Sequence, residues 1–186
     1  MCGITGYITN SSISDIGILR NMVSRLAHRG PDDEGGIIYQ VQNKDVGLGQ
    51  SRLSIIDLSI AGHQPMEYND YSIVYNGEIY NFQTIKINLV KLGYEFRTTS
   101  DTEVICAAYL EYGENCVSHF NGMFAFVIYD VKKQLFFGAR DRLGQKPFYY
   151  YHNGRDFEFS SQISSIQLHN DNLTISSKSI NYFLLY

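Results

Sequence analysis

The sequence predicts an α+β domain in which layers of helices cover antiparallel sheets. Apolar residues recur at helical spacing in three stretches of the first two thirds of the chain, around residues 14–27, 82–92 and 101–113. β-rich runs recur throughout and become dense after residue 120, where short turn signals separate them. Short connections between strands are typical of antiparallel hairpins, and this arrangement favours the α+β class over a doubly wound fold.

The first quarter of the chain is predicted to form a strand, a helix and two further strands. Residues 3–8 form the first strand. Apolar side chains at spacings of three and four predict a helix over 14–27, which Gly30-Pro31 ends. Strands over 35–39 and 46–48 follow and are expected to pair around a polar turn.

A strand and a helix are predicted in the middle of the chain. Residues 71–75 form a strand that runs into Asn76-Gly77, a pair that favours turns. A helix over 82–92 follows, with Asn81 as its expected N-cap and Gly93 just past its end.

The last third begins with a helix and continues as strands. Ser100-Asp-Thr-Glu103 has the spacing of a capping box, so a helix is expected from about Asp101 to about Gly113. Four strands should follow, over residues 123–129, 134–139, 148–151 and 157–160. We find no internal repeat and no low-complexity linker, so residues 1–186 are expected to form one domain.

Composition excludes several classes of protein. The chain has 186 residues, with 15 Lys and Arg against 19 Asp and Glu, a formal net charge of −4. This balance and the lack of a basic cluster argue against nucleic-acid binding. No apolar run is long enough to span a membrane. The first residues lack the basic and apolar segments of a secretory signal, so a cytoplasmic protein is expected.

The cysteines and histidines do not suggest a disulfide framework or a metal site. There are three cysteines, none in a CxxC pair. Cys106 and Cys116 lie among apolar residues and are expected to be small core residues. The five histidines form no spaced ligand set.

Cys2 is the residue on which function depends. It is followed by glycine, and we expect the initiator methionine to be removed, which would give Cys2 a free α-amine. The ordinary pKa of such an amine is about 7.7–8.0 and that of a thiol is about 8.5, so the neutral amine can accept the thiol proton. A single residue can then act as both nucleophile and base. Taken alone the signal is weak, since many proteins begin with Met-Cys by chance.

Eight motifs stand in one order over roughly residues 2–165. They are Met1-Cys-Gly-Ile-Thr-Gly6, His28-Arg-Gly-Pro-Asp-Asp-Glu-Gly35, Arg52-Leu-Ser-Ile-Ile-Asp57, Gly62-His-Gln-Pro65, Asn76-Gly-Glu-Ile-Tyr-Asn81, Ser100-Asp-Thr-Glu-Val104, Gly122-Met-Phe-Ala-Phe126, and Gly138-Ala-Arg-Asp-Arg-Leu-Gly144 with Lys146-Pro147. The set resembles the class II glutamine amidotransferases, and within them the glutaminase domain of glutamine-hydrolysing asparagine synthetases. The resemblance implies an N-terminal-nucleophile hydrolase fold, a four-layer αββα sandwich.

The resemblance also implies roles for individual residues. Cys2 matches the nucleophile that attacks the side-chain amide of L-glutamine. Asn76 and Gly77 match the oxyanion hole, through the side-chain amide and the backbone N–H. Fixed neutral donors of this kind stabilise the negative charge of a tetrahedral intermediate.

The remaining matches concern the charged ends of an amino acid. Arg52 matches the residue that binds the substrate α-carboxylate, which a planar guanidinium can do with two hydrogen bonds. Glu78 and Asp101 match acidic positions near the α-ammonium. The backbones of Leu53 and Ile55 match positions that line the same pocket.

Each of these residues also has a purely structural interpretation. Arg52 could form a surface salt bridge, Asp101 could be only a helix cap, and Asn76-Gly77 could be only a hairpin turn. Taken together with Cys2 as one ordered set, these residues favour the catalytic interpretation. Two alternatives stay open: a catalytically silent structural or protein-binding module of the same fold, and an amidase for other acyl amides, which the charged residues disfavour.

Sequence features indicate which subfamily the chain resembles and which partner is expected. The chain lacks tryptophan and carries Arg29-Gly-Pro-Asp32, which favours the asparagine-synthetase type over relatives that make amino sugars or purines. Gln162 replaces an acidic residue that is common in the family. No phosphate-binding loop is present, so ATP and Mg²⁺ are expected only in a synthetase domain or subunit that this chain does not contain, and no cofactor is expected here. The ammonia acceptor stays open.

Overall fold

The computed structural model describes residues 1–10, 16–42, 44–54, 62–166 and 174–185. Its strands form two antiparallel sheets. The first sheet has the order β2 (Asp33–Val41), β3 (Lys44–Arg52), β1 (Gly3–Thr9), β9 (Phe157–Ser160) and β8 (Tyr149–His152). The second has the order β4 (Met66–Tyr68), β5 (Tyr71–Ile79), β6 (Gly122–Asp130) and β7 (Leu135–Arg140).

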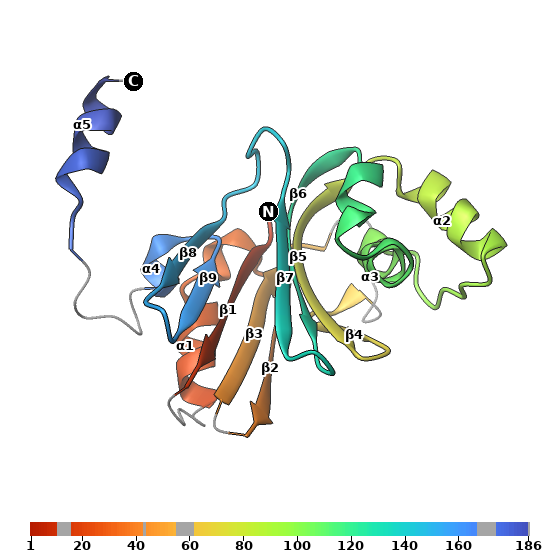
Figure 1. The fold of residues 1–186 in the computed structure, drawn as a ribbon, viewed down its shortest axis with the longest axis horizontal. Helices are drawn as coiled ribbons and strands as arrows, with labels where there is room; N and C mark the ends of the chain where they lie inside the picture. Colours follow the sequence, from red (N-terminus) through yellow and green to blue (C-terminus); the bar gives the residue numbers. More distant parts are fainter. Residues whose placement is uncertain (11–15, 43, 55–61, 167–173, 186) are drawn as a thin grey trace.

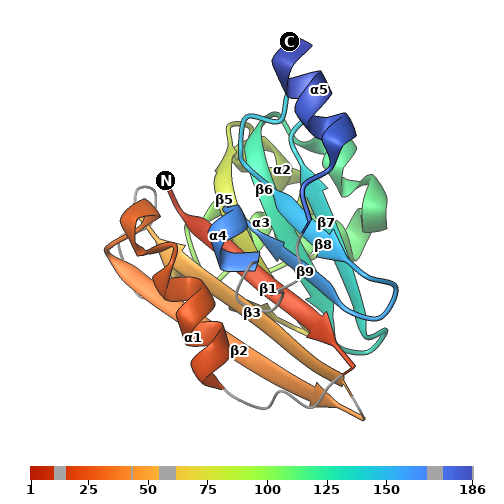
Figure 2. The same cartoon turned by 90° about the vertical axis from the view of Figure 1, so that its left-hand side faces the viewer.

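Helices cover the outer face of each sheet (Figure 1). The helices α1 (Ile16–Ser24) and α4 (Ile163–Ile166) pack on the first sheet, and α1 crosses the strands β1 to β3 in the second view (Figure 2). The helices α2 (Phe82–Lys91) and α3 (Asp101–Tyr112) cover the second sheet. The last helix, α5 (Ser177–Leu185), extends away from these layers (Figure 1). The α+β class and the αββα sandwich are thereby confirmed.

Successive side chains of a strand point to opposite faces of its sheet, so one set lies between the two sheets and the other lies against the helices. Ile4, Leu48, Val74 and Val127 belong to the apolar cluster between the two sheets, where Phe159 joins them. The opposite faces pack on helices. The cluster under α2 and α3 contains these buried residues among others: Ile73, Tyr75, Ile79, Leu89, Val104, Phe126 and both Cys106 and Cys116. The prediction that these two cysteines belong to the core is confirmed.

The expected turn at Asn76-Gly77 is wrong. Both residues lie inside β5, opposite Ala125 and Phe124 of β6. The long pairing of β5 with β6 extends over nine positions, from Tyr71 to Ile79, and overrides the local turn preference.

Helix boundaries differ from the predicted ones for local reasons. The helix α1 ends at Ser24, before the expected end, and i to i+3 hydrogen bonds then form a 3₁₀ turn, η1 (Ala27–Arg29). Asn81 lies at the N-cap of α2, but its side chain bonds the backbone of residues 119 and 121 instead of the helix. Gly93 follows the end of α2 at φ 96°, as predicted.

The helix α3 begins and ends where the sequence predicts, but only half of the expected capping box forms. The Ser100 hydroxyl accepts a hydrogen bond from the Thr102 N–H over 3.1 Å. The Glu103 carboxylate does not return to Ser100. It accepts hydrogen bonds from the N–H groups of Arg97 and Thr98, so it holds the loop that leads into the helix.

The connection between β7 and β8 is not a hairpin, contrary to the expectation from its turn residues. The strand β7 belongs to the second sheet and β8 to the first, so residues 141–148 cross between the two sheets. The hairpins β6–β7 and β8–β9 do form as predicted.

The described residues contain neither a helix that could cross a membrane nor a cluster of metal ligands. No described helix combines the length and the apolar character that a membrane crossing requires. Within the same residues, no three His, Cys, Asp or Glu side chains gather as a metal-binding group.

Candidate active site

A pocket of about 150 Å³ lies beside Cys2, the residue that precedes β1. Seven of the eight predicted site residues line it: Cys2, Arg52, Leu53, Asn76, Gly77, Glu78 and Asp101. They come from both sheets and from the first residue of α3. The eighth, Ile55, lies outside the described residues.

Strand alternation explains why both sheets contribute to the pocket. Ile4 faces the space between the sheets, so Cys2, two residues earlier, is on the same face of the chain. Leu48 and Val74 belong to the same layer, which places Arg52 and Asn76 in it as well. The nucleophile candidate and the amide candidate therefore face each other across the gap between the sheets.

The Cys2 thiol is held by the end of β3. Its Sγ accepts a hydrogen bond from the Leu53 N–H over 3.4 Å and lies 3.6 Å from the Leu53 carbonyl oxygen. The Arg29 guanidinium donates through Nε to the Cys2 carbonyl over 3.1 Å. Met1, which precedes Cys2, is 57% exposed at the edge of the pocket.

Asn76 presents a buried donor that the described protein leaves unused. The residue is 1% exposed, and its Nδ2 has no hydrogen-bond partner among the described residues. A buried amide without a partner costs about 1–3 kcal/mol. Such a cost is typical of a group that is reserved for a ligand, and Asn76 lines the same pocket as Cys2.

The Gly77 N–H is a second free donor. Gly77 lies opposite Phe124, but both backbone groups of Phe124 bond Asp141 instead, over 3.2 Å to Oδ2 and 2.8 Å from the Asp141 N–H. Facing residues of an antiparallel pair exchange both hydrogen bonds or neither. Gly77 and Phe124 are thus a non-hydrogen-bonded pair, and the Gly77 N–H points to the outer edge of β5.

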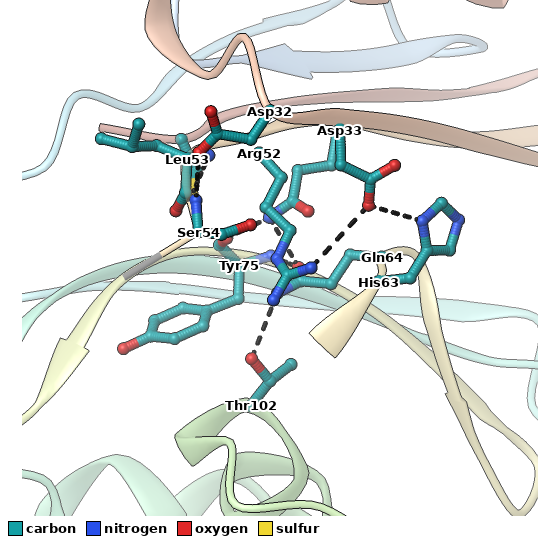
Figure 3. A network of polar contacts seen from close by, with 11 residues as sticks. Asp32, Asp33, Arg52, Leu53, Ser54, His63, Gln64, Tyr75 and Thr102 are labelled. Carbon is teal, nitrogen blue, oxygen red and sulfur yellow. Dashed lines mark hydrogen bonds and ion pairs between the residues drawn. The ribbon is translucent and has the colours of Figure 1, made fainter. Parts of the chain in front are cut away.

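Side chains hydrogen-bond this edge of β5 on both sides of Gly77, and Figure 3 shows one of them, Gln64, beside Tyr75. The Tyr75 N–H donates to Gln64 Oε1 over 2.7 Å, and the Tyr75 carbonyl accepts from Gln50 Nε2 over 2.6 Å. The Ile79 N–H donates to Asp101 Oδ2 over 3.0 Å. Since β4 pairs only with the first residues of β5, no described strand covers Gly77, and its N–H remains available to a ligand.

Replacing Gly77 by alanine is expected to lower the free energy of unfolding by about 1–3 kcal/mol. A Cβ at this position would collide with the carbonyl oxygen of Met123 and lie 2.7 Å from Cα of Phe124, both of which are backbone atoms. Gly138→Ala is the matched control, because its Cβ would meet its nearest neighbour at an ordinary 3.5 Å. Urea denaturation of both variants measures the difference, and equal stabilities would contradict the close approach.

Asp101 is both a structural and an electrostatic element of the pocket. Its carboxylate accepts the Tyr75 hydroxyl over 2.7 Å as well as the Ile79 N–H. Burial raises the pKa of Asp101, and these two hydrogen bonds oppose the rise. A desolvated carboxylate in a pocket wall is a favourable neighbour for a ligand ammonium group.

Arg52 also lines the pocket and belongs to a second charged group of side chains. Its Nη1 lies 3.9 Å from Asp33 Oδ2, and the same carboxylate oxygen lies 2.8 Å from His63 Nδ1 (Figure 3). Arg52 is 8% exposed and the Asp33 side chain is 32% exposed, so the salt bridge that the sequence left open is a half-buried contact beside the pocket.

The sequence did not assign roles to several residues that build the site. Gln64 joins Gln50, Tyr75 and Thr102 in one network, in which its Nε2 donates to Thr102 Oγ1 over 3.1 Å. The motif Gly62-His-Gln-Pro65 was the available signal. Lys146 also lines the pocket and belongs to the last quoted motif.

Comparison with known proteins identifies the family. The family model of a glutamine amidotransferase domain matches residues 1–186. The chain belongs to this family. Asparagine synthetase [glutamine-hydrolyzing] 3 of Bacillus subtilis is 41% identical over 177 residues, which are 92% of this chain and 28% of that protein. Asparagine synthetase [glutamine-hydrolyzing] 1 of the same organism is 35% identical over 192 residues, 100% of this chain and 30% of that protein.

A solved structure confirms the fold of this amidotransferase domain. Glutamine phosphoribosylpyrophosphate amidotransferase from B. subtilis matches with a TM-score of 0.73 at 20% identity, over 90% of this chain and 43% of that one. The chain spans about a third or less of the length of the curated relatives named above. The resemblance to class II amidotransferases is confirmed.

Proposed function

We propose that this domain hydrolyses L-glutamine to glutamate and ammonia, with Cys2 as the nucleophile. The observation that carries the proposal is the pocket itself, which Cys2 lines together with two residues whose neutral donors are unused, Asn76 through Nδ2 and Gly77 through its N–H. An enzyme for acyl transfer needs these groups together, a nucleophile and an oxyanion hole.

The reaction starts from a Cys2 whose α-amine is free, so it requires removal of Met1. The thiol gives its proton to the amine while Sγ bonds to the side-chain carbonyl carbon of glutamine. The oxyanion receives hydrogen bonds from Asn76 and Gly77. The C–N bond then breaks, the amine returns the proton to the leaving nitrogen as ammonia forms, and water hydrolyses the thioester to glutamate.

Charged side chains at the two sides of the pocket select a free amino acid. The Arg52 guanidinium binds the α-carboxylate, while Glu78 and Asp101 accept the α-ammonium. Leu53, and Ile55 beyond the described residues, complete the pocket through their backbones. An uncharged acyl amide would offer no cation to the buried Asp101 carboxylate and no carboxylate to the Arg52 guanidinium, which disfavours an amidase for such substrates.

Replacing Arg52 by lysine is expected to raise the KM for glutamine by about 10- to 100-fold with a smaller change in kcat. Lysine keeps the charge but loses the planar pair of donors that fits a carboxylate. Steady-state ammonia release measures both constants, and Arg155→Lys, at an exposed turn, is the matched control. An unchanged KM would remove Arg52 from the binding role.

We further propose that the ammonia serves an ATP-dependent synthetase domain or subunit, as the names of the relatives suggest for those proteins. ATP and Mg²⁺ would act there, and no cofactor takes part in the glutaminase step. A cytoplasmic location suits a catalytic thiol, since that compartment keeps cysteines reduced and the three cysteines here are free. Neither nucleic acid nor membrane is a proposed partner.

Ammonia and glutamate release from glutamine by protein that lacks Met1 tests the function. Equal amounts of the two products are expected. Release of neither product, from protein whose mass shows that Met1 is absent, would instead favour the silent module.

A further inference from the structure

Lys146 lies in a loop that several hydrogen bonds hold in place. It lies in the segment 141–148, which crosses from one sheet to the other. The Asp141 carboxylate accepts hydrogen bonds from the N–H groups of Leu143, Gln145 and Lys146 over 3.2, 2.8 and 3.0 Å, and from that of Phe124 over 3.2 Å. Burial alone would raise the pKa of Asp141, but these donors lower it. The carboxylate therefore ties the loop to β6.

The Lys146 side chain is buried in the pocket without a counter-ion. It is 5% exposed and lines the pocket together with Cys2. Its Nζ lies 3.3 Å from Met1 Sδ, and no carboxylate of the described residues lies within 4.0 Å of it. A buried cation without an ion pair is costly, so its position calls for a functional reason.

We propose that Lys146 is a positioning residue that keeps the α-amine of Cys2 in its neutral, proton-accepting form. This inference rests on the proposed function. Lys146 and Cys2 line the same pocket, and Lys146 Nζ lies 3.3 Å from the Met1 side chain, so we expect the ammonium to be a near neighbour of the Cys2 amine once Met1 is removed. A fixed ammonium disfavours a second positive charge beside it, so the amine protonates less readily.

Three of the other charged groups near Cys2 already have partners in the protein. Arg29 donates to the Cys2 carbonyl, and Arg52 pairs with Asp33. Asp101 accepts two hydrogen bonds from protein donors. Glu78 also faces the pocket, and as an anion it favours protonation of the amine, opposite to Lys146.

The electrostatic coupling to Cys2 has the expected sign. Burial lowers the pKa of Lys146, and the negative charge of a Cys2 thiolate acts against that shift. A negative charge at Cys2 and the Lys146 ammonium therefore lie close enough to interact.

The test is the pH profile of kcat/KM for glutamine in the processed wild-type protein and in Lys146→Met. The acid limb reports the free amine, because activity rises as the amine loses its proton. We expect the midpoint of this limb to move up by about 1 pH unit in Lys146→Met. At a pH below both midpoints, kcat/KM of Lys146→Met should be about tenfold lower than that of wild type. Above pH 9 the two proteins should have the same kcat/KM. Lys146→Arg should keep the wild-type midpoint.

Controls separate this inference from a structural effect and from the proposed function. Lys91→Met, on the exposed face of α2, removes a charge far from the pocket and should leave the profile unchanged. A uniform loss at every pH, or a raised KM with an unmoved midpoint, would overturn the role of Lys146. If wild-type protein without Met1 releases no ammonia at any pH, the proposed function fails instead.

A second measurement needs no variant. In wild-type protein labelled with ¹⁵N at cysteine, the Cys2 α-amine should titrate with a midpoint below pH 7, under the ordinary 7.7–8.0. A midpoint at or above 8 would overturn the proposal, even if Lys146→Met failed to fold.

Discussion

We expect the Cys2→Ser protein to release ammonia from glutamine at less than about a thousandth of the wild-type rate. A hydroxyl holds its proton far more tightly than a thiol, so the neighbouring amine cannot activate it to the same extent. The change replaces one sulfur atom by oxygen and leaves the other residues of the pocket unchanged. Steady-state ammonia release on protein freed of Met1 measures the loss.

Cys116→Ala is the matched control for the nucleophile. Cys116 is fully buried under α3, and burial raises the pKa of its thiol to about 12. Its replacement should lower stability while kcat and KM stay within about twofold of wild type. Wild-type turnover by Cys2→Ser would remove Cys2 from the mechanism.

The second large effect is expected from Asn76→Ala, a fall in kcat of about 100- to 1,000-fold with little change in KM. The donor it removes acts on the charge of the tetrahedral intermediate and not on the neutral substrate amide. The free energy of unfolding should drop by no more than about 1 kcal/mol, because Nδ2 has no partner among the described residues to lose. An activity loss without a stability loss distinguishes an oxyanion donor from a structural amide.

Asn115→Ala, at an exposed position of the 3₁₀ segment η3 (Gly113–His119), provides the comparison for Asn76. It should change neither kcat nor stability measurably. If Asn76→Ala kept wild-type kcat, the oxyanion hole would have to be built from other groups.

The sequence predicted elements well where local chemistry decides them. Ser100 begins α3 as a side-chain cap, and Gly93 ends α2 with a positive φ. It failed at Asn76-Gly77, because a turn preference is local whereas the pairing with β6 joins residues about 50 positions apart. It also could not show that the loop after β7 changes sheets, since two strands joined by a short loop usually pair.

The site was predictable as a set of residues but not as a geometry. Motif order indicated Cys2, Asn76 and Arg52, and strand alternation explains why they face one gap. The free edge of β5 could not be foreseen, because it depends on Asp141 taking both backbone groups of Phe124 and on Gln64 reaching Tyr75. Such contacts form between separate segments of the folded chain, so no local sequence pattern predicts them.

The most direct measurement of the central claim is the intact mass of the protein before and after treatment with the glutamine mimic 6-diazo-5-oxo-L-norleucine. The mass before treatment should lack one methionine, and treatment should add one label, which peptide mapping places on Cys2. The Arg52→Lys protein should react more slowly at the same reagent concentration. A chain that keeps Met1 and still hydrolyses glutamine, or a label on Cys106 or Cys116, would contradict the account.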